Sequence, residues 1–237
     1  MSARYMKARI KCLPLALMLI GCGQTSTDSK VSYATFTPGR ETMRAWSAFT
    51  TIEQRSCILP VQLYATAGAY VSPEQAAFVR QSTARAVIAW TGALEQNPYW
   101  PCKNRVRVSW GEAGSGTVQI YLEQSVSRAY SLVGQNKIFL SLASAVPSDA
   151  FAERVILHEF GHMFGLADTY SEAGYQTPIG QAPGIMNQLY QVGGLTSDDI
   201  NGANALYEYI NGRREFCSSP YTVGGAWENP RRIAFCV

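Results

Sequence analysis

The stretch HEFGHMFGLAD, which occupies residues 158–168, contains both histidines of the 237-residue chain. It follows the pair Ser148-Asp149, which is typical of a helix start. Apolar residues after this pair recur at helical spacing, and Gly165 readily adopts the left-handed conformation that ends helices. The sequence therefore predicts a helix that carries the HEFGH segment and stops at Gly165.

The spacing of the two histidines indicates a metal site. Residues four apart lie on one face of a helix, so the imidazoles of His158 and His162 can bind one ion. Glu159 would lie beside the metal, where its carboxylate can accept a proton from water. A catalytic zinc site needs a third protein ligand, and without a third histidine this is an aspartate, a glutamate or an unpaired cysteine. Asp168 is the best placed, because Gly165 can turn the chain back.

Hydrophobic periodicity and turn residues predict the other elements of one mixed domain. Ser72-Pro73-Glu74 is a typical helix start, and residues 105–110 alternate as a half-buried strand does. The run 128–133 is the weakest strand candidate. In chain order we expect a helix over 72–93, strands over 105–110, 117–122, 128–133 and 137–142, the helix ending at Gly165, and a helix from 196 or 197 to about 212.

The first 21 residues have the pattern of an export signal. Four basic residues precede an apolar run, 13–20, that is much shorter than the roughly 20 residues needed to span a bilayer. The run ends in LIGC, residues 19–22, which resembles the lipobox of bacterial lipoproteins, where the cysteine receives a diacylglyceryl group. The alternative is a plain secretory signal in which Cys22 is incidental.

This interpretation divides the chain into a signal over 1–21, a lipidated tether over 22–32 and a folded domain over 33–237. The tether is rich in Gly, Ser and Thr and is expected to be flexible. Gly23 and Gln24 after the cysteine resemble lipoproteins sent to the outer membrane. We expect a protein of the bacterial cell envelope, anchored through Cys22, on the periplasmic or the outer face.

Charge and cysteine content support an exported protein without a nucleic-acid partner. The chain has 20 basic and 17 acidic residues, and loss of the signal leaves 16 against 17, with no basic cluster typical of nucleic-acid binding. Four cysteines remain after Cys12 and Cys22, and an even number in an exported chain favours two disulfides, with three possible connectivities. We favour Cys57 with Cys102 and Cys217 with Cys236. A cysteine zinc site is a weaker alternative, because no C-x-x-C spacing occurs.

The histidine stretch resembles the H-E-x-x-H-x-x-G-x-x-H zinc motif of the metzincin metalloproteases, with Asp168 in place of the last histidine. Snapalysin-like metzincins have aspartate there, whereas Gly161 and Gly165-Leu166 resemble the matrixin branch. Downstream, residues 184–187 (GIMN) are similar to the Met-turn, which places a methionine, here Met186, beneath the metal. Residues 195–207 resemble the last helix of matrixin catalytic domains.

This resemblance implies an α+β fold: a twisted, mostly parallel sheet with an antiparallel edge strand, a long active-site helix and a small C-terminal subdomain. It implies one catalytic zinc ion held by His158, His162 and Asp168. The implied activity is that of a zinc-dependent endopeptidase, which hydrolyses peptide bonds by a metal-activated water with Glu159 as general base. A peptide or protein substrate would bind extended along the edge strand, here 128–133.

The sequence departs from relatives of this type at several positions. Gln188 stands where some metzincins have a tyrosine after the methionine, and Tyr190 comes two positions late, so we expect no tyrosine ligand. No histidine remains for the structural zinc of matrixins. No D-x-D-x-D loop indicates calcium, whose presence stays open, as does the oligomeric state.

Two other functions remain open on the sequence. One is a non-catalytic, zinc-containing envelope lipoprotein that binds peptides or proteins without cutting them. The presence of Glu159 argues against it, because a purely structural site has no use for a base. The other is a structural anchor or adhesin with a coincidental motif, which would bind no zinc.

Overall fold

The computed structural model describes residues 47–111, 114–124, 126, 128–142, 145, 149–166, 184–186, 192–212, 216–217 and 234–235. The predicted signal, the tether with Cys22, and Asp168 lie outside these residues. The elements are, in chain order, α2 (Ala48–Gln54), β1 (Ile58–Ala65), α3 (Pro73–Gly92), β2 (Arg107–Trp110), β3 (Val118–Glu123), β4 (Tyr130–Leu132), η1 (Val133–Gln135), β5 (Lys137–Ser141), α4 (Ala150–Phe164), α5 (Ser197–Ile210), β6 (Phe216–Cys217) and β7 (Ala234–Phe235).

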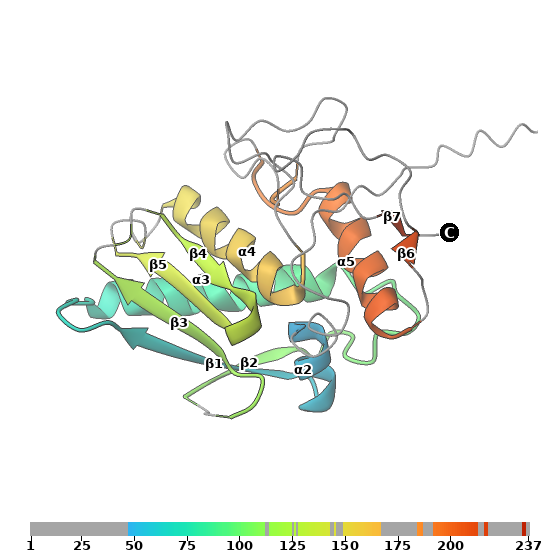
Figure 1. Ribbon diagram of the computed structural model, residues 1–237, viewed down its shortest axis with the longest axis horizontal. Helices are drawn as coiled ribbons and strands as arrows, with labels where there is room; N and C mark the ends of the chain where they lie inside the picture. The colour runs from blue at the N-terminus through green and yellow to red at the C-terminus, as the bar shows by residue number, and fades with distance from the viewer. Residues whose placement is uncertain are drawn as a thin grey trace, which may run out of the picture.

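Strands β1 to β5 form one sheet in the order β2-β1-β3-β5-β4 (Figure 1). The β1–β2, β1–β3 and β3–β5 pairs are parallel, whereas β4 runs antiparallel to β5. The register places Ser131 of β4 opposite Ile138 of β5. The predicted mostly parallel sheet with an antiparallel edge strand is therefore confirmed.

Helices α3 and α4 lie side by side and share a hydrophobic core with one face of the sheet (Figure 1). Alternate residues of β3 supply part of that face, and Ile120 and Leu122 are fully buried. The indole of Trp90 on α3 is also fully buried and donates a hydrogen bond to the carbonyl of Leu157 on α4, at 2.8 Å. This contact fixes α3 against the middle of the helix that carries the histidines.

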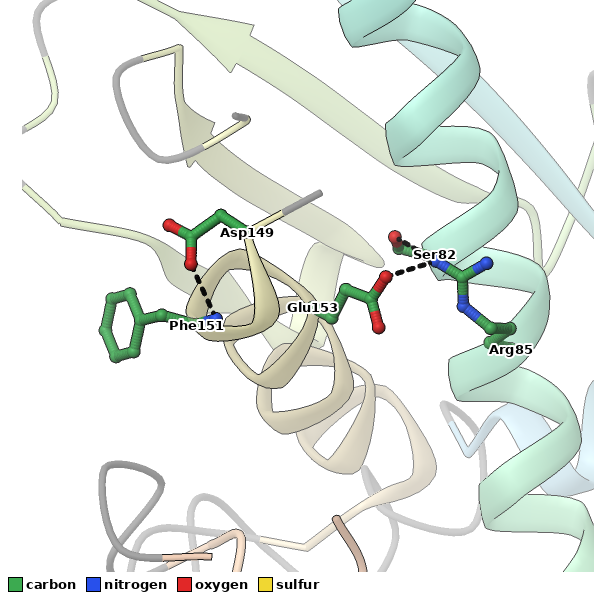
Figure 2. Close-up of polar contacts among 5 residues, drawn as sticks. All are labelled: Ser82, Arg85, Asp149, Phe151 and Glu153. Carbon is green, nitrogen blue, oxygen red and sulfur yellow. Dashed lines mark hydrogen bonds and ion pairs between the residues drawn. The ribbon is translucent and has the colours of Figure 1, made fainter. Parts of the chain in front are cut away.

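The ends of both helices form where the sequence predicts them. Helix α3 begins with a capping box, in which the Ser72 hydroxyl accepts from the Gln75 amide and the Gln75 side chain accepts from the Ser72 amide. Helix α4 begins after Asp149, whose carboxylate accepts from the amide of Phe151 at 2.8 Å (Figure 2). It ends at Gly165, which has the left-handed φ of 106°.

The N-terminal end of α4 is joined to α3 by an ion pair between Arg85 and Glu153, with 2.5 Å between Nη2 and Oε1 (Figure 2). The same guanidinium nitrogen also donates to the hydroxyl of Ser82. About half of the Arg85 side chain remains exposed, so solvent screens the pair.

Five of the described elements were not predicted: the short η1, β6 and β7, and two that support the sheet and the histidine helix, β1 and α2. Strand β1 lies between β2 and β3, and its Pro60 is a residue that central strands normally exclude. The carbonyls of Cys57 and Val61 accept from the amides of Arg107 in β2 and of Gly111 just after it, so the backbone groups of alternate residues, including Pro60, face the β3 side. Pairing with β3 begins only at Val61, so the missing N–H of Pro60 breaks no ladder bond. Helix α2 has only seven residues and includes two β-branched threonines, Thr50 and Thr51, which gives it a weak sequence pattern.

The other face of the sheet carries a row of four stacked rings on neighbouring strands. Successive rings are 4.9, 5.1 and 4.6 Å apart between centroids and nearly parallel, and they belong to Tyr64, Tyr121, Phe139 and Tyr130. Each neighbouring pair is also a pair in the strand register. Cross-strand aromatic pairs of this kind stabilise sheets, and here the row holds the short edge strand β4 against β5.

A disulfide joins Cys57, which precedes β1, to Cys102, with 5.4 Å between the Cα atoms, as predicted. Cys236 and the side chain of Cys217 lie outside the described part of the chain, so the second predicted disulfide stays a prediction. The C-terminal region contains α5 and the short antiparallel pair of β6 with β7. Among the described residues, no helix is both long and apolar enough to cross a membrane.

Candidate metal centre

The two histidines lie on the last two turns of α4 with their rings close together. Their centroids are 4.8 Å apart and the rings are nearly perpendicular, at 86°. His158 is 4% exposed, and His162 is half-buried. The predicted i, i+4 arrangement therefore places two imidazoles side by side at the C-terminal end of the helix.

Hydrogen bonds to backbone carbonyls orient both rings through the same atom. Nδ1 of His158 lies 2.8 Å from the carbonyl oxygen of Ile185, and Nδ1 of His162 lies 2.9 Å from that of Leu166. A carbonyl only accepts, so each Nδ1 carries a hydrogen, and in the neutral imidazole Nε2 then carries the lone pair. This is the arrangement in which zinc-binding histidines are held by a second layer of hydrogen bonds.

The turn at Gly165 makes the second of these bonds possible. After the last helical residue, the chain reverses, and the amide of Leu166 bonds to the carbonyl of Gly161 at 2.9 Å. This 6→1 bond is typical of a Schellman ending. It brings the Leu166 carbonyl back to His162, so the glycine that ends the helix also sets the orientation of a candidate ligand.

The turn at residues 184–186 packs against the helix next to the histidines. A Cβ on Gly161 would lie 2.3 Å from Sδ of Met186 and 2.9 Å from Cζ2 of Trp90, so only glycine fits between them. Met186 is buried. The family resemblance alone placed this methionine beneath the metal. The structure shows it in contact with α4 at Gly161, the residue before His162.

Asp199, in the first turn of α5, holds that turn in place. Its carboxylate accepts from the amides of Ile185 and Met186 at 2.9 and 3.4 Å, and also from the amide and hydroxyl of Thr196. Asp199 is 2% exposed, and Gly184 packs so closely on its carboxylate that a Cβ would lie 2.8 Å away. In the structure Asp199 also forms a capping box with Thr196. The expected start of this helix near Thr196 did not reveal the bonds of Asp199 to residues 13 and 14 positions earlier.

Aromatic packing against α2 supports the same end of α4. The ring of Phe164 lies 4.4 Å from that of Phe49 on α2, and Phe49 also contacts Trp100 and Tyr207 edge to face. The hydroxyl of Ser47 donates to the carbonyl of Phe164 while it accepts from the amide of Phe49. The unpredicted helix α2 thus anchors the C-terminal end of the histidine helix.

Glu159 contacts the edge strand of the sheet directly. Its side chain is 4% exposed, and its Oε2 accepts a hydrogen bond of 2.5 Å from the hydroxyl of Ser131 on β4. No described residue donates to the other oxygen, Oε1. The sequence analysis missed Ser131, because nothing local distinguishes it from any serine in a short strand.

The donor chemistry of this end of α4 fits zinc, as far as the described residues extend. Two imidazoles with lone pairs on Nε2 and an adjacent carboxylate are a usual part of a catalytic zinc site. No group of three His, Cys, Asp or Glu side chains able to hold a metal occurs within the described ranges. The predicted third ligand, Asp168, lies outside them, as do Gln188 and Tyr190.

Comparisons with known proteins add little to this geometry. Neither a family model nor a curated protein sequence matches the chain. Among solved structures, the crystal structure of myroilysin matches with a TM-score of 0.41 and 16% sequence identity, covering 63% of this chain and 82% of that chain. A likeness at this level supports no argument about the site, which therefore rests on the residues described above.

Proposed function

We propose that the protein is a zinc-dependent endopeptidase of the metzincin type, which hydrolyses peptide bonds with Glu159 as general base. The observation that supports it best is the pair of histidines oriented through Nδ1 by backbone carbonyls, with a buried carboxylate between them in the sequence. His158, His162 and Asp168 would hold the ion. When bound, zinc would polarise the scissile carbonyl and make water more acidic.

The chain's own residues would perform the proton transfers. Glu159, through Oε1, would take a proton from the attacking water and pass it to the nitrogen of the leaving amine. Burial of Glu159 and His158 would keep bulk water from competing for these groups. Met186, which packs on Gly161, and Asp199, which holds the turn at 184–186, would fix the position of the histidine helix.

A peptide substrate would bind along β4, the edge strand next to the proposed base. An edge strand offers unpaired backbone groups, and an extended peptide can add to it as a further strand. Ser131 of this strand contacts Glu159, so a peptide aligned on β4 would bring its backbone close to the base.

We also propose that the enzyme is a lipoprotein of the bacterial cell envelope, anchored in the membrane through a lipid on Cys22. The signal pattern over residues 1–21 and the LIGC sequence support this. The Cys57–Cys102 disulfide is consistent with an oxidising compartment outside the cytoplasm.

Digestion of an unfolded protein by the purified full chain tests the activity. We expect cleavage by the wild type, loss of cleavage with a zinc chelator, and recovery when zinc is returned. Glu159→Gln should reduce the rate by roughly 10²- to 10⁴-fold, as expected for loss of a general base, while it keeps its zinc.

Equal, chelator-insensitive cleavage by the wild type and by Glu159→Gln would contradict the mechanism. Stoichiometric zinc with no cleavage of any peptide would instead support the non-catalytic, peptide-binding alternative. Absence of zinc would leave the anchor or adhesin as the better interpretation.

A further inference from the structure

Strand β4 contacts the proposed base through the hydroxyl of a single serine. The Ser131 hydroxyl lies 2.5 Å from Glu159 Oε2 and 3.4 Å from the Glu159 carbonyl oxygen. A hydroxyl has one hydrogen to donate, and the shorter distance assigns it to the carboxylate. Hydrogen bonds to an ionised carboxylate are among the stronger ones in proteins.

The position of Ser131 is itself fixed on both faces of the strand. Tyr130 and Leu132 are more than one-third exposed, whereas Ser131, between them, is half-buried and contacts α4. Tyr130 stacks on Phe139 at 4.6 Å, which holds β4 from the other face of the sheet. The hydroxyl is therefore held at a defined position relative to the helix, and not carried on a loose loop.

A carboxylate without such a contact would have rotational freedom. The terminal torsion of glutamate is broad, so burial alone does not decide where its two oxygens lie. With Oε2 held by Ser131, the carboxylate plane is set and Oε1 is the oxygen left to accept a proton. Catalytic groups lose much of their effect when they are misplaced by about 1 Å.

We propose that Ser131 is a positioning residue, which holds Glu159 through Oε2 and ties the orientation of the base to the strand along which the substrate aligns. The inference rests on the proposed function of Glu159. Ser131 does not take part in the proton transfers. Its role is to keep the base at a fixed distance from the bound peptide, because Glu159 and the peptide would both be hydrogen-bonded to β4.

A matched pair of variants separates the hydroxyl from the shape of the side chain. Ser131→Thr keeps the hydroxyl, Ser131→Val has the same branched shape without it, and strands tolerate both residues. Kinetics would be measured on the full chain with a quenched fluorescent peptide, designed from a cleavage site found in the unfolded-protein digest. We expect Ser131→Val to lower kcat by roughly 10- to 100-fold, the range for a lost hydrogen bond to a charged group, with KM within about twofold.

Ser131→Thr is expected to stay within about threefold of the wild-type kcat, since it can make the same hydrogen bond. The same change in kcat for Thr and Val, or a loss confined to KM, would overturn the proposal. Melting temperatures of both variants show whether a lower kcat reflects unfolding. Unfolding caused by the branched side chain would occur in the Thr and the Val form alike. If the wild type cleaves and Glu159→Gln does not, but Thr and Val agree, this inference alone fails. If Glu159→Gln cleaves as well as the wild type, the proposed function fails with it.

Discussion

The two ends of helix α4 each hold a glutamate in a short hydrogen bond, but in opposite surroundings. Near the N-terminal end, Glu153 pairs with Arg85 of α3 at 2.5 Å, and 43% of its side chain is exposed (Figure 2). Six residues further along, Glu159 accepts from Ser131 at the same distance but is only 4% exposed. One carboxylate pairs with a cation at the protein surface, whereas the other accepts from a neutral hydroxyl inside the protein.

This difference separates a structural contact from a functional one. An exposed ion pair contributes between about 0 and 1 kcal/mol, and its loss has little consequence. A buried carboxylate that faces a neutral donor is costly to the fold, and proteins keep such groups mainly at functional sites. The turn at 184–186 and Asp199 also fix the surroundings of the C-terminal end of α4.

The largest contrast in activity is expected between the loss of an imidazole near the C-terminal end of α4 and the loss of a carboxylate near its N-terminal end. His162→Ala takes away a proposed zinc ligand and should reduce peptide cleavage to background, by about 10³-fold or more. Glu153→Gln at the other end should leave kcat/KM within about twofold of the wild type, because its partner is screened by solvent. Assays of both variants with the same peptide check this, and a comparable loss in Glu153→Gln would remove the distinction between the two ends.

The same Asp→Asn change should be costly near the two histidines and harmless at the start of α4. Asp199→Asn replaces an acceptor oxygen by a donor where buried amides already donate, and we expect a loss of about 2–3 kcal/mol of unfolding free energy. Asp149→Asn keeps a good N-cap, so its effect should stay within about 0.5 kcal/mol. Urea denaturation measures both. Equal stabilities would mean that Asp199 does not hold the turn.

A Gly→Ala pair tests the close packing under the histidines. Gly161→Ala would push Cβ into Met186 and Trp90, and overpacking of this kind costs about 1–3 kcal/mol. Gly92, the last residue of α3, has open space where a Cβ would lie, with no neighbouring atom within 4 Å, so Gly92→Ala should be neutral or stabilise by up to about 1 kcal/mol. Thermal unfolding of both variants decides, and a Gly161→Ala protein as stable as Gly92→Ala would contradict the tight contact with Met186.

The smallest effect is expected from the ion pair itself. A double-mutant cycle with Arg85→Ala and Glu153→Ala should give a coupling energy below about 1 kcal/mol, which falls further when salt is added. A salt-independent coupling of several kcal/mol would show that the N-terminal end of α4 is not screened as its exposure indicates.

Local sequence signals were sufficient for the parts of the fold that depend on neighbouring residues. The capping box of Ser72 with Gln75, the cap at Asp149 and the left-handed Gly165 all lie within a few residues of the element that they start or end. The histidine spacing is also local, since four residues on a helix fix it. The antiparallel edge strand was expected only through the family resemblance, and the structure has it at Tyr130–Leu132.

Features that depend on distant contacts could not be read from the sequence. Strand β1 contains a proline that is tolerated only because its missing N–H faces the place where β3 has not yet begun. Ser131 and Glu159 are 28 residues apart, and Asp199 reaches a turn 13 and 14 residues earlier. No pattern in a single sequence links such pairs, because each depends on how separate elements pack.

Zinc analysis of the purified full chain is the most direct test of the claim that the C-terminal end of α4 is a metal centre. After exposure to micromolar zinc and removal of free metal, we expect about one zinc ion per chain in the wild type and in Glu159→Gln, whose ligands are intact. His158→Ala, although folded, should hold less than about a tenth of that amount. A wild type without bound zinc, or a His158→Ala protein that keeps a full equivalent, would contradict the claim.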